Sequence, residues 1–217
     1  MTSDGNDLLV IMAIGVGLGL LPFLVITFTS FIKIAVVMFL IRNALGIQQT
    51  PPNLVLYAIA VVLALYISSP VIAEVYANVN DPALTYETFS DWERAAEGAK
   101  GPVKEYLQRF TSAKEREFFM TATARIWSEE AQQQVSSEDL IILVPSFIVS
   151  ELTRAFEIGF LLYLPFIVID LVVSAVLMSL GMIMVSPLVI SVPFKLFLFV
   201  IVDGWSRLMH GLVLSYG

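Results

Sequence analysis

Apolar and polar residues follow one another along this chain in long blocks. Leu8 to Ile41 is apolar, a polar link runs from Arg42 to Asn53, and Leu54 to Ala73 is twenty residues without a charge. A polar insertion from Glu74 to Asp139 then precedes a second apolar half from Leu140 to Val202. Because about twenty apolar residues in a helix cross a hydrocarbon core of ~30 Å, this pattern predicts an all-α, membrane-associated chain.

These blocks divide the chain into three predicted units. Residues 1–73 form an N-terminal hydrophobic helical hairpin, residues 74–139 a polar helical subdomain, and residues 140–217 a C-terminal broken hydrophobic hairpin. No basic stretch precedes the first apolar block. We therefore expect that this block is retained and is not cleaved as a signal peptide.

The polar link between the first two apolar blocks predicts a tight turn between two helices. Gly46 suits the position just past a helix C-terminus, where a left-handed backbone is favoured. Thr50–Pro51 suits an N-cap followed by proline at the first helical position. Arg42, without an acid in the short link, favours a cytoplasmic turn and places the insertion outside. The residues assigned to this cytoplasmic-side turn are Arg42, Asn43, Gly46, Gln48, Gln49, Pro51 and Pro52.

The insertion carries most of the charge of the chain. Residues 78–139 hold twelve acidic and seven basic side chains. Capping boxes at Ser90–Glu93 and Ser112–Glu115 predict two helices, and Gly101–Pro102 predicts a break between them. We interpret this segment as a solvated helical subdomain.

The second apolar half does not resemble two plain membrane spans. Leu171 to Leu180 gives ten residues of helix before Gly181, about 15 Å, and Leu188 to Val202 gives about 22 Å. We therefore expect a helix, a break and a second helix, with Asp170 at a segment boundary where it could cap a helix. Irregular backbone at membrane depth needs shelter in protein or a water-filled path. This pattern favours an assembly or a pore.

The predicted break holds Met182 and Met184. Residues two apart on a regular helix point to nearly opposite faces, so one helical stripe cannot present both. Gly181 permits unusual dihedral angles and Pro187 disfavours helical backbone before it; these two residues are the predicted hinges of an irregular loop. Methionine adapts its shape to its surroundings. The pair therefore either fills a core or forms a yielding ring around a pore in a symmetric assembly.

Charged residues also stand inside this second apolar half. Glu151, Arg154 and Glu157 recur every three residues and share one side of a helix, where Arg154 can pair with both acids. Lys195 has only apolar neighbours in the sequence. It either meets a carboxylate such as Glu151 on another helix or a neighbouring subunit, or extends to the membrane interface. A proton relay through Glu151, Glu157 and Asp170 is a further interpretation.

Composition narrows the class of protein. Of 217 residues, 58% are hydrophobic and 14% charged, with a mean hydropathy of +0.84, which is typical of a membrane protein. The chain has no cysteine and a single histidine, His210, which excludes thiolate and multi-histidine metal sites. A net charge of −7 argues against a nucleic-acid-binding surface. Nucleotide-binding, zinc-protease and nucleophile-elbow motifs are absent, so we expect no enzymatic activity and no cofactor.

Three stretches resemble the signature blocks of the type III secretion export-gate family. They are "RNALGIQQTPPN", "SELTRAFEIGFLLYLPFIVIDLVVSAVLMSLGMIMVSP" and "PFKLFLFVIVDGW". The resemblance is to the R subunit of the virulence injectisome, the counterpart of the P subunit of the flagellar export gate. It covers both apolar halves, about two-thirds of the chain.

The resemblance implies a subunit of a helical, conical export gate. Five R-type copies would associate with S- and T-type subunits, with further export-apparatus proteins, and with the ring and rod proteins of the basal body. Unfolded polypeptides would pass through a gate that sits in the bacterial inner membrane, largely on its periplasmic side, in contact with lipid. No nucleic acid is expected as a partner.

The family's methionine-rich loop implies a seal around the closed channel. The matching residues here are Met182, Ile183 and Met184, with isoleucine where methionine is more usual. Two alternatives remain: a stand-alone polytopic secondary transporter that uses the intramembrane acids, and a structural nucleator without a sealing role.

Overall fold

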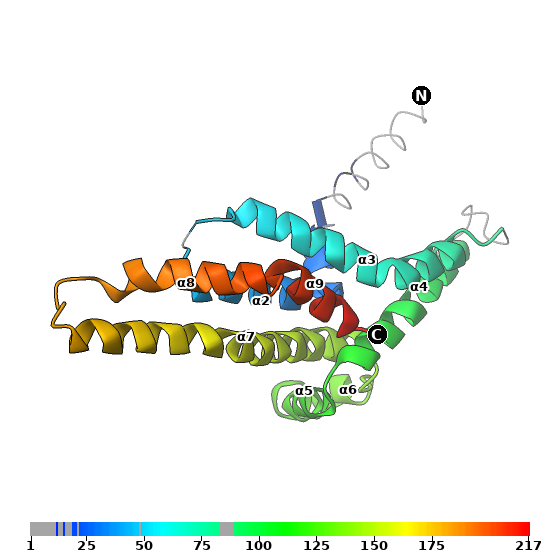
Figure 1. The fold of residues 1–217 in the computed structure, drawn as a ribbon. Helices are drawn as coiled ribbons and strands as arrows, with labels where there is room; N and C mark the ends of the chain where they lie inside the picture. The colour runs from blue at the N-terminus through cyan, green and yellow to red at the C-terminus, as the bar shows by residue number, and fades with distance from the viewer. Residues whose placement is uncertain (1–11, 13–14, 16–18, 21, 48, 83–88) are drawn as a thin grey trace.

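The computed structural model describes residues 12, 15, 19–20, 22–47, 49–82 and 89–217. Within them the chain is helical and has no strand, which confirms the all-α prediction. Gln48 of the predicted turn and the first eleven residues lie outside the described residues. The labelled helices are α2 (Phe31–Ala44), α3 (Asn53–Val79), α4 (Phe89–Phe110), α5 (Ala113–Ile126), α6 (Glu129–Gln132), α7 (Leu140–Ser179), α8 (Pro187–Ile201) and α9 (Gly204–Leu214) (Figure 1).

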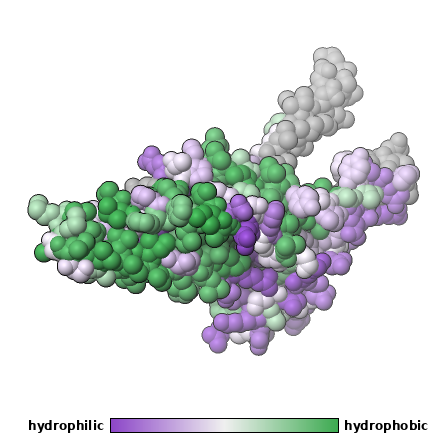
Figure 2. All heavy atoms as spheres, viewed as in Figure 1, coloured by the Kyte–Doolittle hydropathy of each residue, from purple (hydrophilic) through white to green (hydrophobic). Residues whose placement is uncertain are grey.

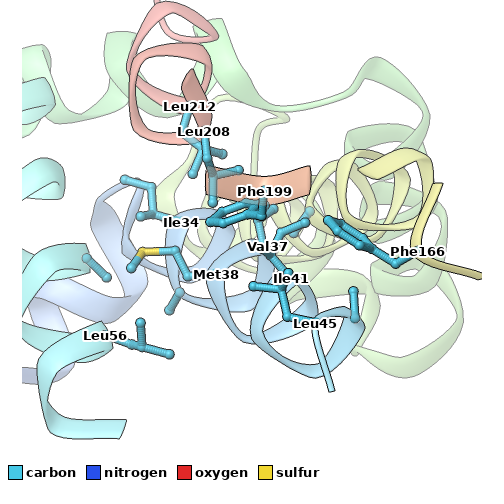
Figure 3. Close-up of a cluster of buried hydrophobic side chains, with 14 residues drawn as sticks. Ile34, Val37, Met38, Ile41, Leu45, Leu56, Phe166, Phe199, Leu208 and Leu212 are labelled. Atoms are coloured by element: carbon cyan, nitrogen blue, oxygen red, sulfur yellow. The ribbon is translucent and has the colours of Figure 1, made fainter. Parts of the chain in front are cut away.

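Helix α2 is the centre of the fold (Figure 3). Apart from Lys33, Arg42 and Asn43 its side chains are apolar, and such a helix needs other helices to cover it. Helix α7 comes closest: a β-carbon added at Gly159 would lie 2.2 Å from Leu40 Cδ1 of α2. The core that surrounds α2 includes Ile34, Val37, Met38 and Ile41 of α2 itself, Leu56 of α3, Phe166 of α7, Phe199 of α8, and Leu208 and Leu212 of α9.

Helix α7 is one continuous helix of 40 residues. The expected boundary near Asp170 is therefore wrong, because the helix continues to Ser179. Pro145 and Pro165 also lie inside this helix. A proline in a helix interior costs about 3 kcal/mol. The helix continues because it packs along α2, α4, α5 and α8, and because a break would leave further backbone groups unpaired among apolar side chains. At about 60 Å, α7 exceeds the ~30 Å hydrocarbon core.

The link between α2 and α3 is a tight turn, as predicted. Gly46 follows the end of α2 with a φ of 77°, where glycine avoids the clash of a β-carbon. Helix α3 begins at Asn53 with Pro52 as its N-cap, so the expected start at Thr50–Pro51 is wrong. Proline at 52 disfavours helical backbone at the residue before it, and the helix starts only after both prolines.

The insertion is helical, but its helices differ in detail from the prediction. Helix α4 runs through Gly101 and Pro102, so the predicted break there is wrong, and Ser90 lies inside this helix. Ser112 is the N-cap of α5, so the predicted start of this helix is confirmed, but its side chain makes no capping hydrogen bond. Its backbone N–H donates to the Ser150 hydroxyl of α7 at 2.9 Å. Packing of α4 along α3 and α7 keeps the helix intact past its glycine and proline.

A second buried cluster joins the insertion to the apolar half. Its members come from α4, α7 and the C-terminal segment, so the apolar side of α4 is covered while the polar side faces out. Figure 2 shows hydrophilic surface gathered over the insertion and hydrophobic surface over the end formed by α7 and α8. The cluster comprises Tyr106, Leu107, Phe110, Leu143, Phe147 and Tyr216.

Two helices of the described part, α3 and α7, are long and apolar enough to cross a membrane. Two bent pairs would raise the number to four if each were one span: Pro22–Phe28 with α2, bent by 84°, and α8 with α9, bent by 60°. Many of their large apolar side chains are exposed in the single chain. The chain is therefore a membrane protein.

Candidate functional site

The loop of residues 180–186 joins α7 to α8 and contains the predicted seal; we call it the gasket loop. Gly181 has a φ of 70° just past the end of α7. The Met182 N–H donates to the Leu177 carbonyl at 3.0 Å, and the Gly181 N–H donates to the Met178 carbonyl at 3.1 Å. This pair of bonds satisfies the last carbonyls of a helix that ends in a left-handed glycine. Pro187 is the first residue of α8, so one predicted hinge, Gly181, lies at the start of the loop and the other, Pro187, directly follows it.

Three apolar side chains stand out from the fold in this loop. Met182 is 44% exposed, Ile183 87% and Met184 100%. The Val185 N–H donates to the Met182 carbonyl at 3.3 Å, and this turn takes the three side chains out of helical phase. Contiguous exposed apolar side chains mark a contact with another molecule or with lipid.

The polar turn between α2 and α3 is held by Arg42. Its Nη1 donates to the Pro51 carbonyl at 3.1 Å and to Asn53 Oδ1 at 2.6 Å. Arg42 is buried, so the charge that favoured a cytoplasmic turn also fixes the shape of that turn. Of the residues assigned to the cytoplasmic-side turn, Asn43, Gln49 and Pro52 are exposed.

The polar turn and the gasket loop lie toward the same end of the molecule, away from the insertion (Figure 1). Gly46 packs directly on α8: a β-carbon added there would lie 2.7 Å from Val192 Cγ2 and 3.4 Å from Leu188 Cδ1. The first turns of α8 are thus held against the α2–α3 hairpin.

Lys195 lies buried between three helices. Its Nζ donates to Asp170 Oδ2 of α7 at 2.6 Å and to the Ala44 carbonyl of α2 at 3.0 Å. Ala44 is the last residue of α2, so the ammonium satisfies a free carbonyl and meets the negative end of the helix dipole. Lys195 does pair with a carboxylate on another helix, as predicted, but within this chain that carboxylate is Asp170 and not Glu151. Extension to the membrane interface is also wrong, because Lys195 is 2% exposed.

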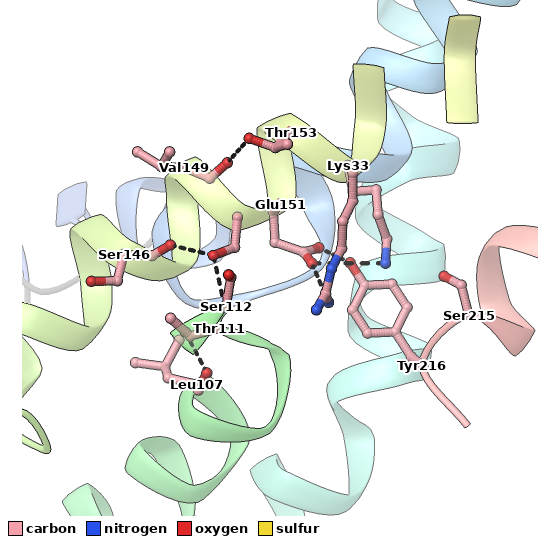
Figure 4. A network of polar contacts seen from close by, with 12 residues as sticks. Lys33, Leu107, Thr111, Ser112, Ser146, Val149, Glu151, Thr153, Ser215 and Tyr216 are labelled. Carbon is pink, nitrogen blue, oxygen red and sulfur yellow. Dashed lines mark hydrogen bonds and ion pairs between the residues drawn. The ribbon is translucent and has the colours of Figure 1, made fainter. Parts of the chain in front are cut away.

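Glu151 is buried where α2, α7 and the C-terminal segment meet (Figure 4). Its Oε1 lies 3.7 Å from both Lys33 Nζ and Arg154 Nη1, and its Oε2 accepts a hydrogen bond from the Tyr216 hydroxyl. Lys33 Nζ also lies 3.5 Å from the centre of the Tyr216 ring, a cation–π contact. Burial and the Glu151 carboxylate raise the pKa of Tyr216, so the phenol stays protonated and can donate. Two cations and a hydroxyl thus compensate one buried carboxylate.

The acids considered for a proton relay do not form a connected path. Glu151 and Asp170 are each paired with a lysine and stand about 28 Å apart along α7. Glu157 is exposed and lines a polar cavity of about 450 Å³ with Arg109 and Arg154. Among the described residues, no group of three or more histidine, aspartate or glutamate side chains could hold a metal.

Sequence reasoning missed Lys33 and Tyr216 as partners of Glu151, and Asp170 as the partner of Lys195. The sequence did contain a signal for Lys33, because a single cation in an apolar run is expected to have a partner. The sequence contained no such signal for Tyr216, because 65 positions separate it from Glu151.

The fold and site define a class: an all-α membrane protein with a central buried helix, internally paired charges and an exposed apolar loop. The FliP family matches residues 14–212. A probable translocation protein, y4yL, of Sinorhizobium fredii is 55% identical over 216 residues, which cover 100% of this chain and 97% of that relative. Yop proteins translocation protein R of Yersinia pestis is 47% identical, with 99% and 97% covered.

The virulence protein YscR of Salmonella typhimurium is 42% identical over 201 residues, with 92% of each chain covered. The chain belongs to the FliP family, which confirms the resemblance drawn from the signature blocks. Relatives are named for the translocation or secretion of proteins. Membership in this family therefore supports a role in a secretion apparatus.

Proposed function

We propose that this chain is a core subunit of the type III secretion export gate in the bacterial inner membrane, and that its gasket loop seals the closed channel. Family membership supports the apparatus. The single observation that supports the seal is the exposure of Met182, Ile183 and Met184 at the end of the α7–α8 hairpin. Three neighbouring apolar side chains in water are unfavourable, and a ring of copies would cover them.

The proposed assembly follows the family. Five copies associate with S- and T-type subunits in a conical gate, largely on the periplasmic side, in contact with lipid, the export apparatus and the rings and rod of the basal body. Secreted polypeptides pass through the centre unfolded. The insertion and the gasket loop lie at opposite ends of this chain (Figure 1).

Gating in this proposal is passive. The hydrogen-bonded end of α7 at Gly181 and the start of α8 at Pro187 hold the base of the loop, while the thioethers at its apex repack around a substrate. Ile183 contributes apolar volume to the ring, although its β-branch makes it stiffer than methionine.

Replacing Met182 and Met184 together with alanine tests the seal. We expect cells with the assembled gate to leak ions and small solutes, because the ring loses both thioether side chains that fill it. Met120→Ala in α5 is the matched control and should leave permeability unchanged. Unchanged permeability in the double variant would contradict the sealing role and favour a structural nucleator.

Extraction in mild detergent tests the assembly separately. A complex with five copies of this chain and small hydrophobic partners supports the gate. A monomer that transports solute in liposomes supports a secondary transporter instead, and removes the proposal.

A further inference from the structure

Three methionines lie close together around the gasket loop. Met178, in the last turn of α7, is 69% exposed, and Met182 and Met184 of the loop are 44% and 100% exposed. The whole chain has eight methionines in 217 residues, so three of them within seven positions form a local concentration of thioether sulfur. Met38, in the core around α2, is 0% exposed. Reagents in solution therefore reach the sulfur at the loop but not the sulfur in this core.

Hydrogen peroxide oxidises an exposed thioether without a metal or a cofactor. The sulfur donates a lone pair to one peroxide oxygen, an S–O bond forms and the O–O bond breaks. The proton of the transferred hydroxyl passes to the departing hydroxide, which leaves as water. The sulfur loses two electrons, the peroxide gains them, and the product is methionine sulfoxide. Because exposure governs this reaction, Met184 should react much faster than Met38.

The product differs in polarity from the side chain that it replaces. A thioether is apolar and flexible, whereas a sulfoxide is polar and its oxygen accepts hydrogen bonds. Inside a ring of apolar side chains this oxygen has no donor, and a buried polar group without a partner is unfavourable. Oxidation of Met182 and Met184 therefore favours the entry of water between the loops. Ile183 contains no sulfur and stays apolar.

The proposed ring leaves its thioethers within reach of peroxide. They face the axis of the channel, which holds water on both sides of the constriction. Hydrogen peroxide is small and uncharged, and it travels where water travels. The gate is proposed to lie largely on the periplasmic side, where the environment is oxidising. Access and compartment thus both favour the reaction at this loop.

We propose that Met182 and Met184 are a modification site for peroxide, and that their conversion to sulfoxides loosens the seal. This inference rests on the proposed sealing role and adds a chemical control to it. The change is reversible, since methionine sulfoxide reductases restore the thioether; two thiols supply the electrons, and the sulfoxide oxygen leaves as water. The permeability of the gate then depends on the balance between peroxide and thiol reductant.

Peptide mass spectrometry of the full-length protein in mild detergent tests the modification. Hydrogen peroxide is added in increments, and the sulfoxide fraction of each methionine is measured. We expect Met182 and Met184 to be oxidised while Met38 stays reduced. Oxidation of Met38 at the rate of Met184 would contradict a site that is defined by exposure.

The permeability of cells with the assembled gate tests the consequence. We expect peroxide to raise the permeability of the wild type to the level of Met182→Ala/Met184→Ala without peroxide. Met182→Leu/Met184→Leu keeps the apolar volume and has no sulfur, so it should stay tight with and without peroxide. This variant also corrects for general damage of the membrane by peroxide.

Two single variants sharpen the comparison. Met178→Leu removes an exposed thioether outside the gasket loop, so it should leak after peroxide as the wild type does. Ile183→Met adds a third thioether to the loop, so its permeability after peroxide should exceed that of the wild type.

Two outcomes of the permeability measurement overturn the proposal. One is a peroxide-induced leak that persists in Met182→Leu/Met184→Leu, and the other is a tight wild type that carries sulfoxides at both residues. The alanine variant decides separately on the seal. If it leaks without peroxide, the sealing role stands and only the modification site is removed; if it does not leak, the sealing role itself is removed.

Discussion

Replacing Asp170 with asparagine tests the ion pair that ties α7 and α8 to the end of α2. Lys195 is 2% exposed and its ammonium has two described partners, Asp170 and the Ala44 carbonyl. Removing one partner of a buried pair costs about 3–5 kcal/mol. The Asp170 side chain is 39% exposed, so water partly replaces it, and we expect a loss of about 2 kcal/mol of unfolding free energy.

Lys195→Met provides the second corner of a double-mutant cycle. It removes the ammonium and leaves the Ala44 carbonyl without its donor, which costs about 1–3 kcal/mol. The double variant Asp170→Asn/Lys195→Met holds no unpaired charge, so it should be less destabilised than the sum of the single variants by about 1–2 kcal/mol.

Thermal unfolding of the full-length chain in mild detergent measures these differences. For a chain of this size, 1 kcal/mol shifts the Tm by about 2–4 °C, so Asp170→Asn should unfold about 4–8 °C below the wild type and Lys195→Met about 2–12 °C below it. A matched control cycle combines Glu151→Gln, in place of Asp170→Asn, with Lys195→Met. We expect Glu151 and Lys195 to be additive within about 0.5 kcal/mol, because Glu151 pairs with Lys33. Additive effects of Asp170 and Lys195, or stronger coupling of Glu151 to Lys195, would refute the assignment.

Three further predictions concern packing, backbone and pH. Gly159→Ala should cost about 1–3 kcal/mol, since the new methyl group meets Leu40; an unchanged Tm would contradict the close contact of α2 and α7. Asp203 has a φ of 52°, so Asp203→Val should lower the Tm by an amount that corresponds to about 1–2 kcal/mol, whereas Asp203→Asn should keep it. The Ser136 backbone N–H holds the pKa of Asp139 below its usual range. Its contribution to stability is therefore present above about pH 4 and lost as the pH falls further; Asp139→Asn should remove this part of the Tm-against-pH curve.

Much of the helical organisation was predictable because it depends on neighbouring residues. The uncharged run after the first link predicted a long membrane helix, observed as α3. Gly46 and Gly181 predicted the ends of α2 and α7, and both have positive φ. Ser112 predicted the start of α5. For the two glycines the deciding interaction lies within a few residues along the chain, whereas the Ser112 side chain makes no capping hydrogen bond and the Ser112 backbone N–H donates to Ser150 of α7.

Local chemistry was misleading where packing outweighs it. The expected boundary at Asp170 and the predicted break at Gly101–Pro102 are both wrong, because α7 and α4 continue through them. A proline costs a few kcal/mol, and burial along several neighbouring helices exceeds that cost over the length of each helix.

The sequence by itself determined that this is an all-α membrane chain of the FliP family with an irregular methionine-containing loop between two apolar helices. Only the tertiary structure decided which charges meet: Lys195 with Asp170, and Lys33, Arg154 and Tyr216 around Glu151. Spacing along the chain orders the residues of one helix, but the partner of a buried charge is chosen by which helices pack together and at what depth. That choice minimises the uncompensated charge of the whole fold, and no short stretch of sequence contains it.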